Sequence, residues 1–381
     1  MKILVTHVPA GSGHQRAAEA IVEAFSYRQD PAEVLLHDAL EGTNWFYQWC
    51  FTRGYLDLIH GVPFLWGVMY HLTDIKGAGP LVEQLHRLSN GLHGRHFENY
   101  LLQLQPDVVI GTHFFPMEVA ATLKSRGLLS AHLITVITDF LPHALWIAPG
   151  IDTYVVASEP TREDLLSRGI PPDRIVRIGI PVDPKFSSAA DGPALARRLD
   201  LAPDRFTVLI GSGGAGTGPI VSLVETLDKM SDPLQLLVIA GKNLRLYKRL
   251  EALKAKIRHP MKIFGFINNM EELMEVSDIL ISKPGGLTCA EAMAKGLPSI
   301  LVHPIPGQET RNAQAMIRMG AAVWASRIQE IPALLKKFRQ NPEDLRAMGR
   351  NARENSVPDA ALKIAELAVR KGLNVKELKR R

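Results

Sequence analysis

The sequence has 381 residues, of which 46% are hydrophobic and 22% charged, and its formal net charge is +5 at pH 7. This length exceeds what one hydrophobic core usually organises, so two domains are expected, and the composition is typical of a folded protein. No apolar run reaches the roughly 18–20 residues that a membrane-spanning helix needs, which argues against an integral membrane protein.

The chain has two cysteines, Cys50 and Cys289, which provide no disulfide framework. Such cysteine usage is typical of a reducing compartment. The first residues reach glycine and histidine too soon for a signal peptide. These features predict a cytoplasmic protein.

Apolar runs alternate with helical patterns along both halves of the chain. In the first half, the predicted strands are 2–8, 33–37, 107–111, 132–138 and 153–157. In the second half, they are 206–210, 234–240, 262–264, 278–282 and 298–302. Because these strands are rich in Val, Ile and Leu, we expect two parallel sheets covered by helices on both faces. Residues 179–193 are rich in Pro, Gly and Ser, and we interpret them as the linker between two α/β domains.

The first predicted strand is followed by a glycine turn, GSGHQRAAEAI at 11–21, that opens a helix. Gly13 would let the backbone approach a ligand closely. His14 could take a proton near neutral pH, because an unperturbed imidazole has a pKa of about 6.5. A phosphate-binding turn is the alternative interpretation.

Residues 42–72 interrupt the strand–helix pattern with a concentration of aromatic residues. They include Trp45, Trp49 and Trp66, which are three of the chain's five tryptophans. Aromatic rings are common at membrane–water interfaces, so this segment could contact lipid. The alternative is that the rings pack in the N-terminal core.

A second polar group of the first half lies in TDFLPHALW at 138–146, where an apolar strand ends. Asp139 and His143 could orient or share a proton near a cleft. Asp139 could instead cap a helix.

The loop GSGGAGTG at 211–218 follows the strand FTVLI and predicts a turn that handles phosphate. The loop also satisfies G-x-G-x-x-G, a weak pattern by itself. A nicotinamide site would need an acidic residue at the end of the next strand to hold the ribose. Lys242 and Asn243 stand there instead, which disfavours an NAD-dependent oxidoreductase.

A second glycine turn, Pro284 to Gly286, lies between a strand that ends at Ser282 and a helix that begins near Leu287. The helix amides and dipole would face an anion at this end. Thr288 could cap the helix or bind phosphate. Glu291 could bind two sugar hydroxyls, or it could be a first-turn acid that complements the dipole.

Gln308 and Glu309 lie in HPIPGQETRNA, residues 303–313, which we expect to be a short loop after a strand. Adjacent amide and carboxylate groups suit sugar hydroxyls, and Asn312 could cap or bind nearby. An ordinary polar loop is the alternative.

Basic residues gather in two runs. Residues 242–262 hold eight Lys and Arg against Glu251 alone, and 370–381 hold six against Glu377. Such runs suit an anionic partner, and a solvated helix face with a frayed tail is the alternative. Metal-ligand and P-loop patterns are absent: the sequence has no H-E-x-x-H, C-x-x-C or G-x-x-x-x-G-K-[ST].

The stretch SKPGGLTCAEAMAKGLPSILVHPIPGQETRNA resembles the glycosyltransferase family 28 C-terminal domain. Together with GSGHQRAAEAI, TDFLPHALW and GIPVDPKF, it is similar to the monogalactosyldiacylglycerol synthase and processive diacylglycerol glucosyltransferase group. The resemblance runs from Ile3 to about Gly320. It implies a GT-B fold, in which two Rossmann-like domains have a nucleotide-sugar cleft between them.

The resemblance also implies how the chain is divided. An acceptor-binding domain for lipid would span 1–180, and a UDP-sugar-binding domain would span 181–355. Residues 356–381 would form a C-terminal helix and basic tail that could cross back to the N-terminal domain.

The family's site residues carry over by matching position. His14 would be the general base or would help to orient the acceptor. Asp139 and His143 would belong to the acceptor-side motif, and Gly13 would lie close to the donor. For the donor, Gly213 and Gly214 would bind the diphosphate, and Phe266 and Ile267 would hold the uracil. Gly285, Gly286 and Thr288 would bind phosphate, Glu291 the ribose, and Gln308 and Glu309 the hexose.

The activity implied is an inverting transfer of a hexose from a UDP-sugar to diacylglycerol or a related lipid, with no metal needed in the chemical step and no other cofactor. The implied partners are the UDP-sugar, the lipid acceptor and an anionic membrane surface at the inner face of the cell membrane, and no nucleic acid. Glucose, galactose and N-acetylglucosamine donors all remain open. Two alternatives are an N-acetylglucosaminyltransferase acting on a polyprenyl-linked peptidoglycan precursor and a non-catalytic protein that binds UDP-sugar or membrane.

Overall fold

The computed structural model describes residues 1–9, 11–28, 32–45, 48, 49, 54, 61, 67, 74, 94–188 and 190–380. The chain divides into two compact units. The first comprises Met1–Pro184, Ile305–Arg311 and Pro358–Arg381, and the second comprises Lys185–Pro304 and Asn312–Val357. The division therefore passes through helix α14 (Gln308–Arg318), whose first turn belongs to the first unit.

The first unit is built on a parallel sheet of six strands in the order β2-β1-β3-β4-β5-β6. The strands are β1 (Lys2–His7), β2 (Glu33–Asp38), β3 (Val108–Gly111), β4 (His132–Val136), β5 (Thr153–Val156) and β6 (Ile175–Arg177). Leu4 pairs with Val109, and Val109 pairs with Leu133 across the centre of the sheet. Every residue of β3 is buried, as expected for a parallel strand covered on both faces.

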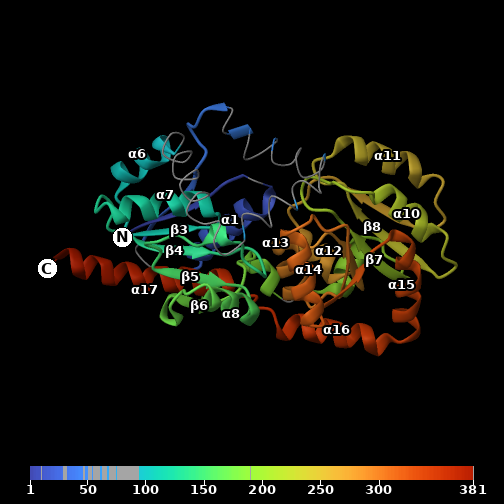
Figure 1. The fold of residues 1–381 in the computed structure, drawn as a ribbon. Helices are drawn as coiled ribbons and strands as arrows, with labels where there is room; N and C mark the ends of the chain where they lie inside the picture. The colour runs from blue at the N-terminus through green and yellow to red at the C-terminus, as the bar shows by residue number, and fades with distance from the viewer. Residues whose placement is uncertain are drawn as a thin grey trace. The chain divides into compact units, whose positions relative to one another are not determined.

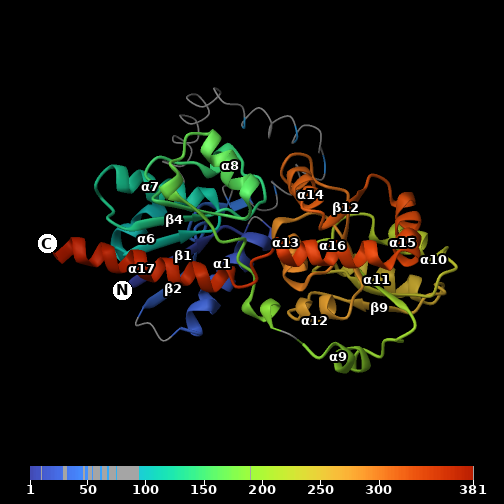
Figure 2. The same cartoon turned by 90° about the horizontal axis from the view of Figure 1, so that it is seen from below.

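Helices cover the first sheet on both faces (Figure 1). They are α1 (Ser12–Ser26), α6 (Arg95–Leu104), α7 (Phe114–Ser125), α8 (Glu159–Ser167) and α17 (Ala360–Arg380). Helix α17 packs along α1 and over β3 and β4, as Figure 2 shows from below. The far C-terminal segment is thus part of the first unit's core, where Ile364 and Ala368 are fully buried.

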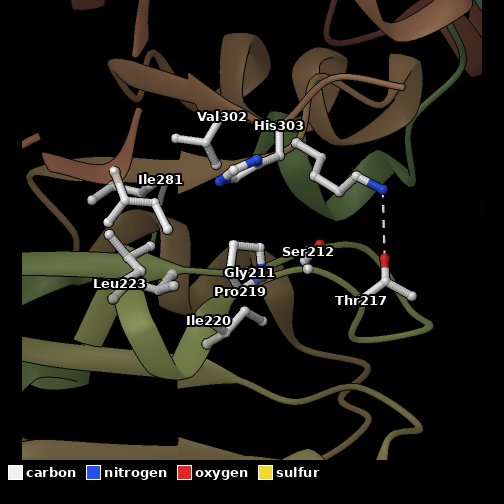
Figure 3. Close-up of a pocket in the computed structure, with 13 residues that line it drawn as sticks. Gly211, Ser212, Thr217, Pro219, Ile220, Leu223, Ile281, Val302 and His303 are labelled. Carbon is white, nitrogen blue, oxygen red and sulfur yellow. Dashed lines mark hydrogen bonds between the residues drawn. The ribbon is translucent and has the colours of Figure 1, made fainter. Parts of the chain in front are cut away.

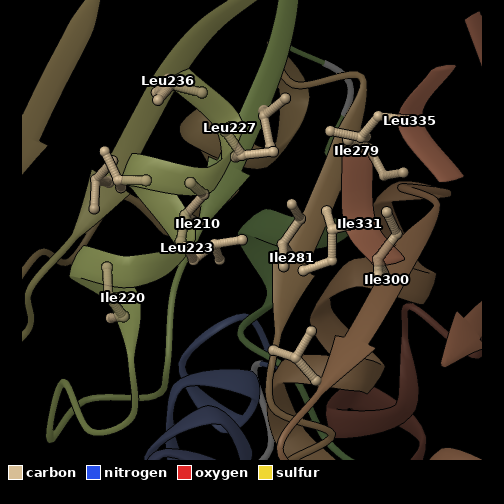
Figure 4. Close-up of a cluster of buried hydrophobic side chains, with 14 of the residues drawn as sticks. Ile210, Ile220, Leu223, Leu227, Leu236, Ile279, Ile281, Ile300, Ile331 and Leu335 are labelled. Atoms are coloured by element: carbon tan, nitrogen blue, oxygen red, sulfur yellow. The ribbon is translucent and has the colours of Figure 1, made fainter. Parts of the chain in front are cut away.

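The second unit has a parallel sheet of six strands in the order β12-β11-β10-β7-β8-β9. The strands are β7 (Phe206–Ile210), β8 (Leu234–Ile239), β9 (Met261–Phe264), β10 (Ile279–Ser282), β11 (Ser299–Val302) and β12 (Ala322–Ala325). Its helices are α9 (Gly192–Arg198), α10 (Ile220–Asp228), α11 (Leu244–Lys254), α12 (Met270–Glu275), α13 (Gly286–Lys295), α14 after Arg311, α15 (Ile331–Gln340) and α16 (Pro342–Glu354). Branched side chains of β7, β10, β11, α10 and α15 fill the core in Figure 4.

The prediction of two parallel α/β sheets is confirmed, and each of the ten predicted strands lies within two residues of an observed one at each end. Strands β6 and β12 were not predicted. Ile175–Arg177 has three residues and ends in an arginine, and Ala322–Ala325 is flanked by small residues. Neither presents the long run of branched residues that marks a buried strand.

Each sheet reverses its strand order at one point. This point lies between β1 and β3 in the first unit and between β7 and β10 in the second. Loops that leave neighbouring strands here run to opposite sides and open a crevice at the carboxyl edge, where ligands bind in open α/β sheets. Site residues are therefore expected in the loops after these four strands.

Candidate active-site residues in the two units

His14 lies in the first turn of α1, after the short turn that follows strand β1. Its Nδ1 is 2.7 Å from the carbonyl oxygen of Thr112 and 3.0 Å from the Thr138 hydroxyl. A carbonyl oxygen can only accept, so Nδ1 carries the proton in the neutral ring and Nε2 keeps its lone pair. This arrangement leaves Nε2 as the nitrogen able to accept a proton.

The protonation of His14 is shifted by its surroundings. Burial lowers the pKa of the imidazole below its ordinary value of 6.5, and the negative charge of Asp139 partly opposes this shift. A lowered pKa keeps the ring neutral at pH 7, which is the form a general base needs.

Aromatic rings surround His14. His113 meets it edge-on, with ring centroids 4.8 Å apart and an interplanar angle of 86°, and Trp146 lies 6.1 Å away. His113 Nδ1 accepts the Phe115 amide at 3.2 Å and caps α7. Burial lowers the pKa of His113 well below the usual range, so this neighbour stays neutral.

Asp139 is buried on the loop after β4, and the structure joins it to Gln308. The Gln308 amide nitrogen lies 2.8 Å from each of the two carboxylate oxygens of Asp139. Both residues belong to the first unit. Asp139 does not cap the next turn, because the N-cap of the short helix η1 (Ala144–Trp146) is His143.

The expectation that Gln308 and Glu309 lie on a loop is wrong, because α14 begins at Gln308. Gly307, with φ of 91°, makes the preceding turn. Glu309 then acts as a first-turn acid, and its carboxylate accepts the Ile305 amide at 2.8 Å. Asn312 is fully buried and donates to the carbonyl oxygen of Pro284 at 3.2 Å.

His143 has a structural contact of its own. It is buried, and its Nδ1 accepts the Leu145 amide at 3.1 Å. This bond caps η1 and directs the backbone of the loop that carries Asp139.

In the second unit, loop 211–218 joins β7 to α10 through three glycines of positive φ, Gly213, Gly216 and Gly218. A Cβ on Gly216 would lie 1.9 Å from the Ala240 carbonyl oxygen, so the loop packs directly on the end of β8. Glycine is therefore required at this position for both conformation and space.

A pocket opens beside this loop at the carboxyl ends of β7, β10 and β11 (Figure 3). Ser212 and His303 line it, and the Ser212 hydroxyl is buried with no hydrogen-bond partner among the described residues. Lys283, which follows β10, reaches the Thr217 hydroxyl at 3.5 Å across the point of strand reversal. Gly213 and Gly214 lie in the same loop.

Helix α13 begins at Gly286, with Gly285 as its N-cap and no side-chain cap. The alternative in which Thr288 caps this helix is therefore wrong. A Cβ on Gly285 would meet no atom within 4 Å, so space is open at this end. Glu291 is buried beyond the first turn, so the first-turn alternative for Glu291 is also wrong.

Phe266 and Ile267 follow strand β9. The Phe266 ring is 44% exposed, and Lys242 Nζ lies 4.9 Å from its centroid. The structure therefore presents an exposed aromatic ring beside a cation at this edge of the second sheet.

Sequence reasoning missed Thr112, His113 and Thr138. The only signal was position, because each follows a strand at the carboxyl edge of the first sheet. Gly13, in contrast, was predicted and lies in the first turn of α1 beside His14.

Most of the aromatic segment 42–72, Trp66 and Cys50 included, lies outside the described residues. Within the described part, Trp45 is 76% exposed and Trp49 is 43% exposed. Among the helices that the structure describes, none is long and apolar enough to cross a membrane.

Two family models match the chain. The monogalactosyldiacylglycerol (MGDG) synthase model matches residues 14–182, and the glycosyltransferase family 28 C-terminal domain model matches residues 207–364.

Two similar curated proteins carry the same name. The processive diacylglycerol beta-glucosyltransferase of Bacillus subtilis strain 168 is 33% identical over 263 residues, which cover 69% of this chain and 68% of the relative. The protein of the same name from Bacillus cereus strain B4264 is 34% identical over 271 residues, which cover 70% of this chain and 69% of the relative.

Solved structures share the fold at low sequence identity. MurG of Acinetobacter baumannii aligns with a TM-score of 0.62 at 17% identity, covering 97% of this chain and 99% of that one. HepE of Anabaena, solved in complex with UDP, aligns with a TM-score of 0.56 at 15% identity and covers 100% of both chains. The GT-B architecture expected from the sequence, two Rossmann-like domains, is thereby confirmed.

Proposed function

This chain belongs to the diacylglycerol glucosyltransferase family within glycosyltransferase family 28, and we propose how its residues carry out sugar transfer. It is a glycosyltransferase that moves a hexose from a UDP-sugar to diacylglycerol or a related membrane lipid. The observation that carries the proposed mechanism is the hydrogen bond from His14 Nδ1 to the Thr112 carbonyl, because it leaves Nε2 ready to accept a proton.

In the proposed reaction, the acceptor hydroxyl attacks the anomeric carbon of the donor. Its proton passes to Nε2 of His14 while the new C–O bond forms and the bond to the diphosphate breaks. The electron pair of the broken bond leaves with UDP, and attack from the opposite side inverts the anomeric centre. The pKa of His14, lowered by burial, keeps the base neutral before the step.

The donor is proposed to bind the second unit. The diphosphate would lie against Gly213, Gly214 and the start of α13, where Gly285 and Gly286 leave the helix amides without a side-chain cap and Thr288 adds a hydroxyl. Backbone amides at a helix N-terminus stabilise the negative charge that develops on the leaving group.

The rest of the donor is assigned along the same unit and on the first turn of α14. The exposed Phe266 and neighbouring Ile267 would hold the uracil, and buried Glu291 the ribose hydroxyls. Gln308 and Glu309 would hold the hexose, with Gln308 oriented by Asp139. His143 would act by shaping the loop of Asp139.

We also propose that the enzyme binds an anionic membrane surface at the inner face of the cell membrane. The support is helix α11 and its flanks, where Lys242, Arg245, Lys248, Arg249, Lys254 and Lys256 are exposed. None of these six makes an ion pair within the described part of the chain. An unneutralised basic face attracts anionic lipid headgroups.

The proposed function is tested by incubating the protein with labelled UDP-glucose, UDP-galactose or UDP-N-acetylglucosamine and with vesicles that contain diacylglycerol. We expect labelled glycolipid with the opposite anomeric configuration to the donor. Parallel samples with a polyprenyl-diphosphate acceptor test the peptidoglycan alternative. UDP-sugar binding without any transfer would support a non-catalytic binding protein and would refute the proposal.

A further inference from the structure

Asp74 is a buried carboxylate that three groups of the first unit contact. Its side chain is 7% exposed, and it accepts the Ala144 amide at 2.8 Å. Arg168, the residue that follows helix α8, forms an ion pair with it at 3.2 Å, and the Arg311 guanidinium donates to it as well. Burial opposes ionisation, but Arg311 and the Ala144 amide more than compensate, so the pKa of Asp74 lies below its usual value.

Arg311 uses two nitrogens for two different partners. Nη2 binds the Asp74 carboxylate, while Nη1 donates to the Pro142 carbonyl oxygen at 3.1 Å. A planar guanidinium can make both bonds at once in a fixed geometry, which an ammonium group cannot. The loop after β4 is thus held at Pro142 by Arg311 and at Ala144 by Asp74.

Gln308 precedes Arg311 by three residues on α14, so both side chains lie on the same face of the helix. Gln308 donates to Asp139, and Arg311 donates to Pro142, three residues further along the same loop. The first turn of α14 therefore contacts this loop at two separate points.

We propose that Asp74 and Arg311 are positioning residues for sugar transfer: they fasten the first turn of α14 to loop 139–144, so that Gln308 and Asp139 keep a fixed geometry. This inference rests on the proposed function of Gln308 and Asp139. Because Gln308 gives its amide protons to Asp139, its carbonyl oxygen is the part left to accept a bond from a sugar hydroxyl.

The test compares Arg311→Ala, Arg311→Lys, Asp74→Asn and the double variant Asp74→Asn/Arg311→Ala with wild type. Arg318→Ala is the matched control, because Arg318 is an exposed arginine on the same helix. For each protein, kcat and KM for the UDP-sugar, the Kd for UDP, the thermal midpoint and hydrogen exchange at the Ala144 amide are measured.

We expect Arg311→Ala to lower kcat by roughly 10- to 100-fold, since small misplacements of binding groups have effects of this size. UDP lacks the hexose, so its Kd should stay within about twofold of wild type. Exchange at Ala144 should accelerate in Asp74→Asn and Arg311→Ala, and the double variant should be no slower in turnover than the worse single one. Arg311→Lys should recover part of kcat, and Arg318→Ala should match wild type.

Wild-type kcat in Arg311→Ala, or unchanged exchange at Ala144, would overturn the inference. So would a parallel loss of kcat, UDP affinity and thermal midpoint that Arg311→Lys does not relieve, because that pattern indicates a structural role only. An inactive wild-type protein would instead refute the proposed function, which separates the two failures.

Discussion

Contacts with Thr112 and Thr138 hold the ring of His14 so that Nδ1 carries the proton and Nε2 can accept one. We predict that His14→Ala lowers kcat by about 10²–10⁴-fold, the usual contribution of a positioned base. Affinity for UDP should persist, because the proposed nucleotide groups belong to the second unit. Turnover and UDP titration calorimetry check this. Gln15→Ala is the control, since Gln15 is an exposed neighbour on α1 whose side-chain amide donates to Glu19. Near wild-type kcat in His14→Ala would remove His14 as the base.

The negative charge of Asp139 raises the pKa of His14, so the pH dependence of activity should respond to Asp139. Activity needs neutral His14, so kcat/KM should fall as the pH drops through the imidazole pKa, which lies below 6.5. Asp139 raises this pKa, so Asp139→Asn should lower it and move the acidic limb of the profile to lower pH. Full profiles of both proteins measure the shift. An acidic limb that stays in place or moves upward would contradict the coupling.

The sequence identified candidate site residues where a polar side chain or a glycine turn follows a predicted strand. The two glycine turns of the second unit, His14 and Asp139 could be predicted as candidates because each directly succeeds an apolar run. Thr112 and Thr138 could not, because they have neither charge nor pattern. They reach His14 from 98 and 124 positions away, and that contact depends on the order β1-β3-β4, which periodicity does not reveal.

At Gln308 the sequence predicts a loop, but the structure has the start of a helix. The run HPIPGQ is rich in Pro and Gly, which predicts a loop, yet the loop ends at Gly307. Glu309 then supplies the first-turn acid that favours a helix beginning here. The role of Asp74 could not be predicted from the sequence, because its partners Arg168 and Arg311 are distant along the chain and contact it only in the folded unit.

Loop 211–218 can be tested as an element. Gly216→Ala places a Cβ 1.9 Å from the Ala240 carbonyl oxygen at a φ of 59°, so the loop must move. We predict a stability loss of about 1–3 kcal/mol from the strained backbone, together with weaker UDP binding. Thermal unfolding and UDP titration measure both effects. Gly192→Ala is the control, because a Cβ at Gly192 meets nothing within 4 Å and lies outside the loop. Equal UDP affinity in both variants would separate this loop from the nucleotide.

For the molecule as a whole, the resemblance to glycolipid enzymes extended over both sheets, and the family and fold that it implied are confirmed. Several spaced motifs in one order carried that result, whereas single motifs were ambiguous. The basic run 242–262 is an example. Its charge could be read from the sequence, but only the structure shows that Leu246 and Leu250 bury one side of α11 while the cations stay exposed.

Attachment to membranes should depend on this basic face. We predict that binding to vesicles rises with the anionic lipid content and falls as salt increases, because exposed charges are screened over about 8–10 Å at 0.10–0.15 M salt. Arg245→Glu/Lys248→Glu/Arg249→Glu should weaken binding at least tenfold, since each basic residue near an anionic surface contributes about 1 kcal/mol. Vesicle co-sedimentation measures this, and turnover on diacylglycerol dispersed in neutral detergent should stay at the wild-type level because these side chains lie outside the proposed site.

Glu225→Gln, a change on helix α10, controls for altered charge elsewhere on the same unit. Salt-independent binding, or equal binding of the triple variant, would show that α11 does not face the membrane.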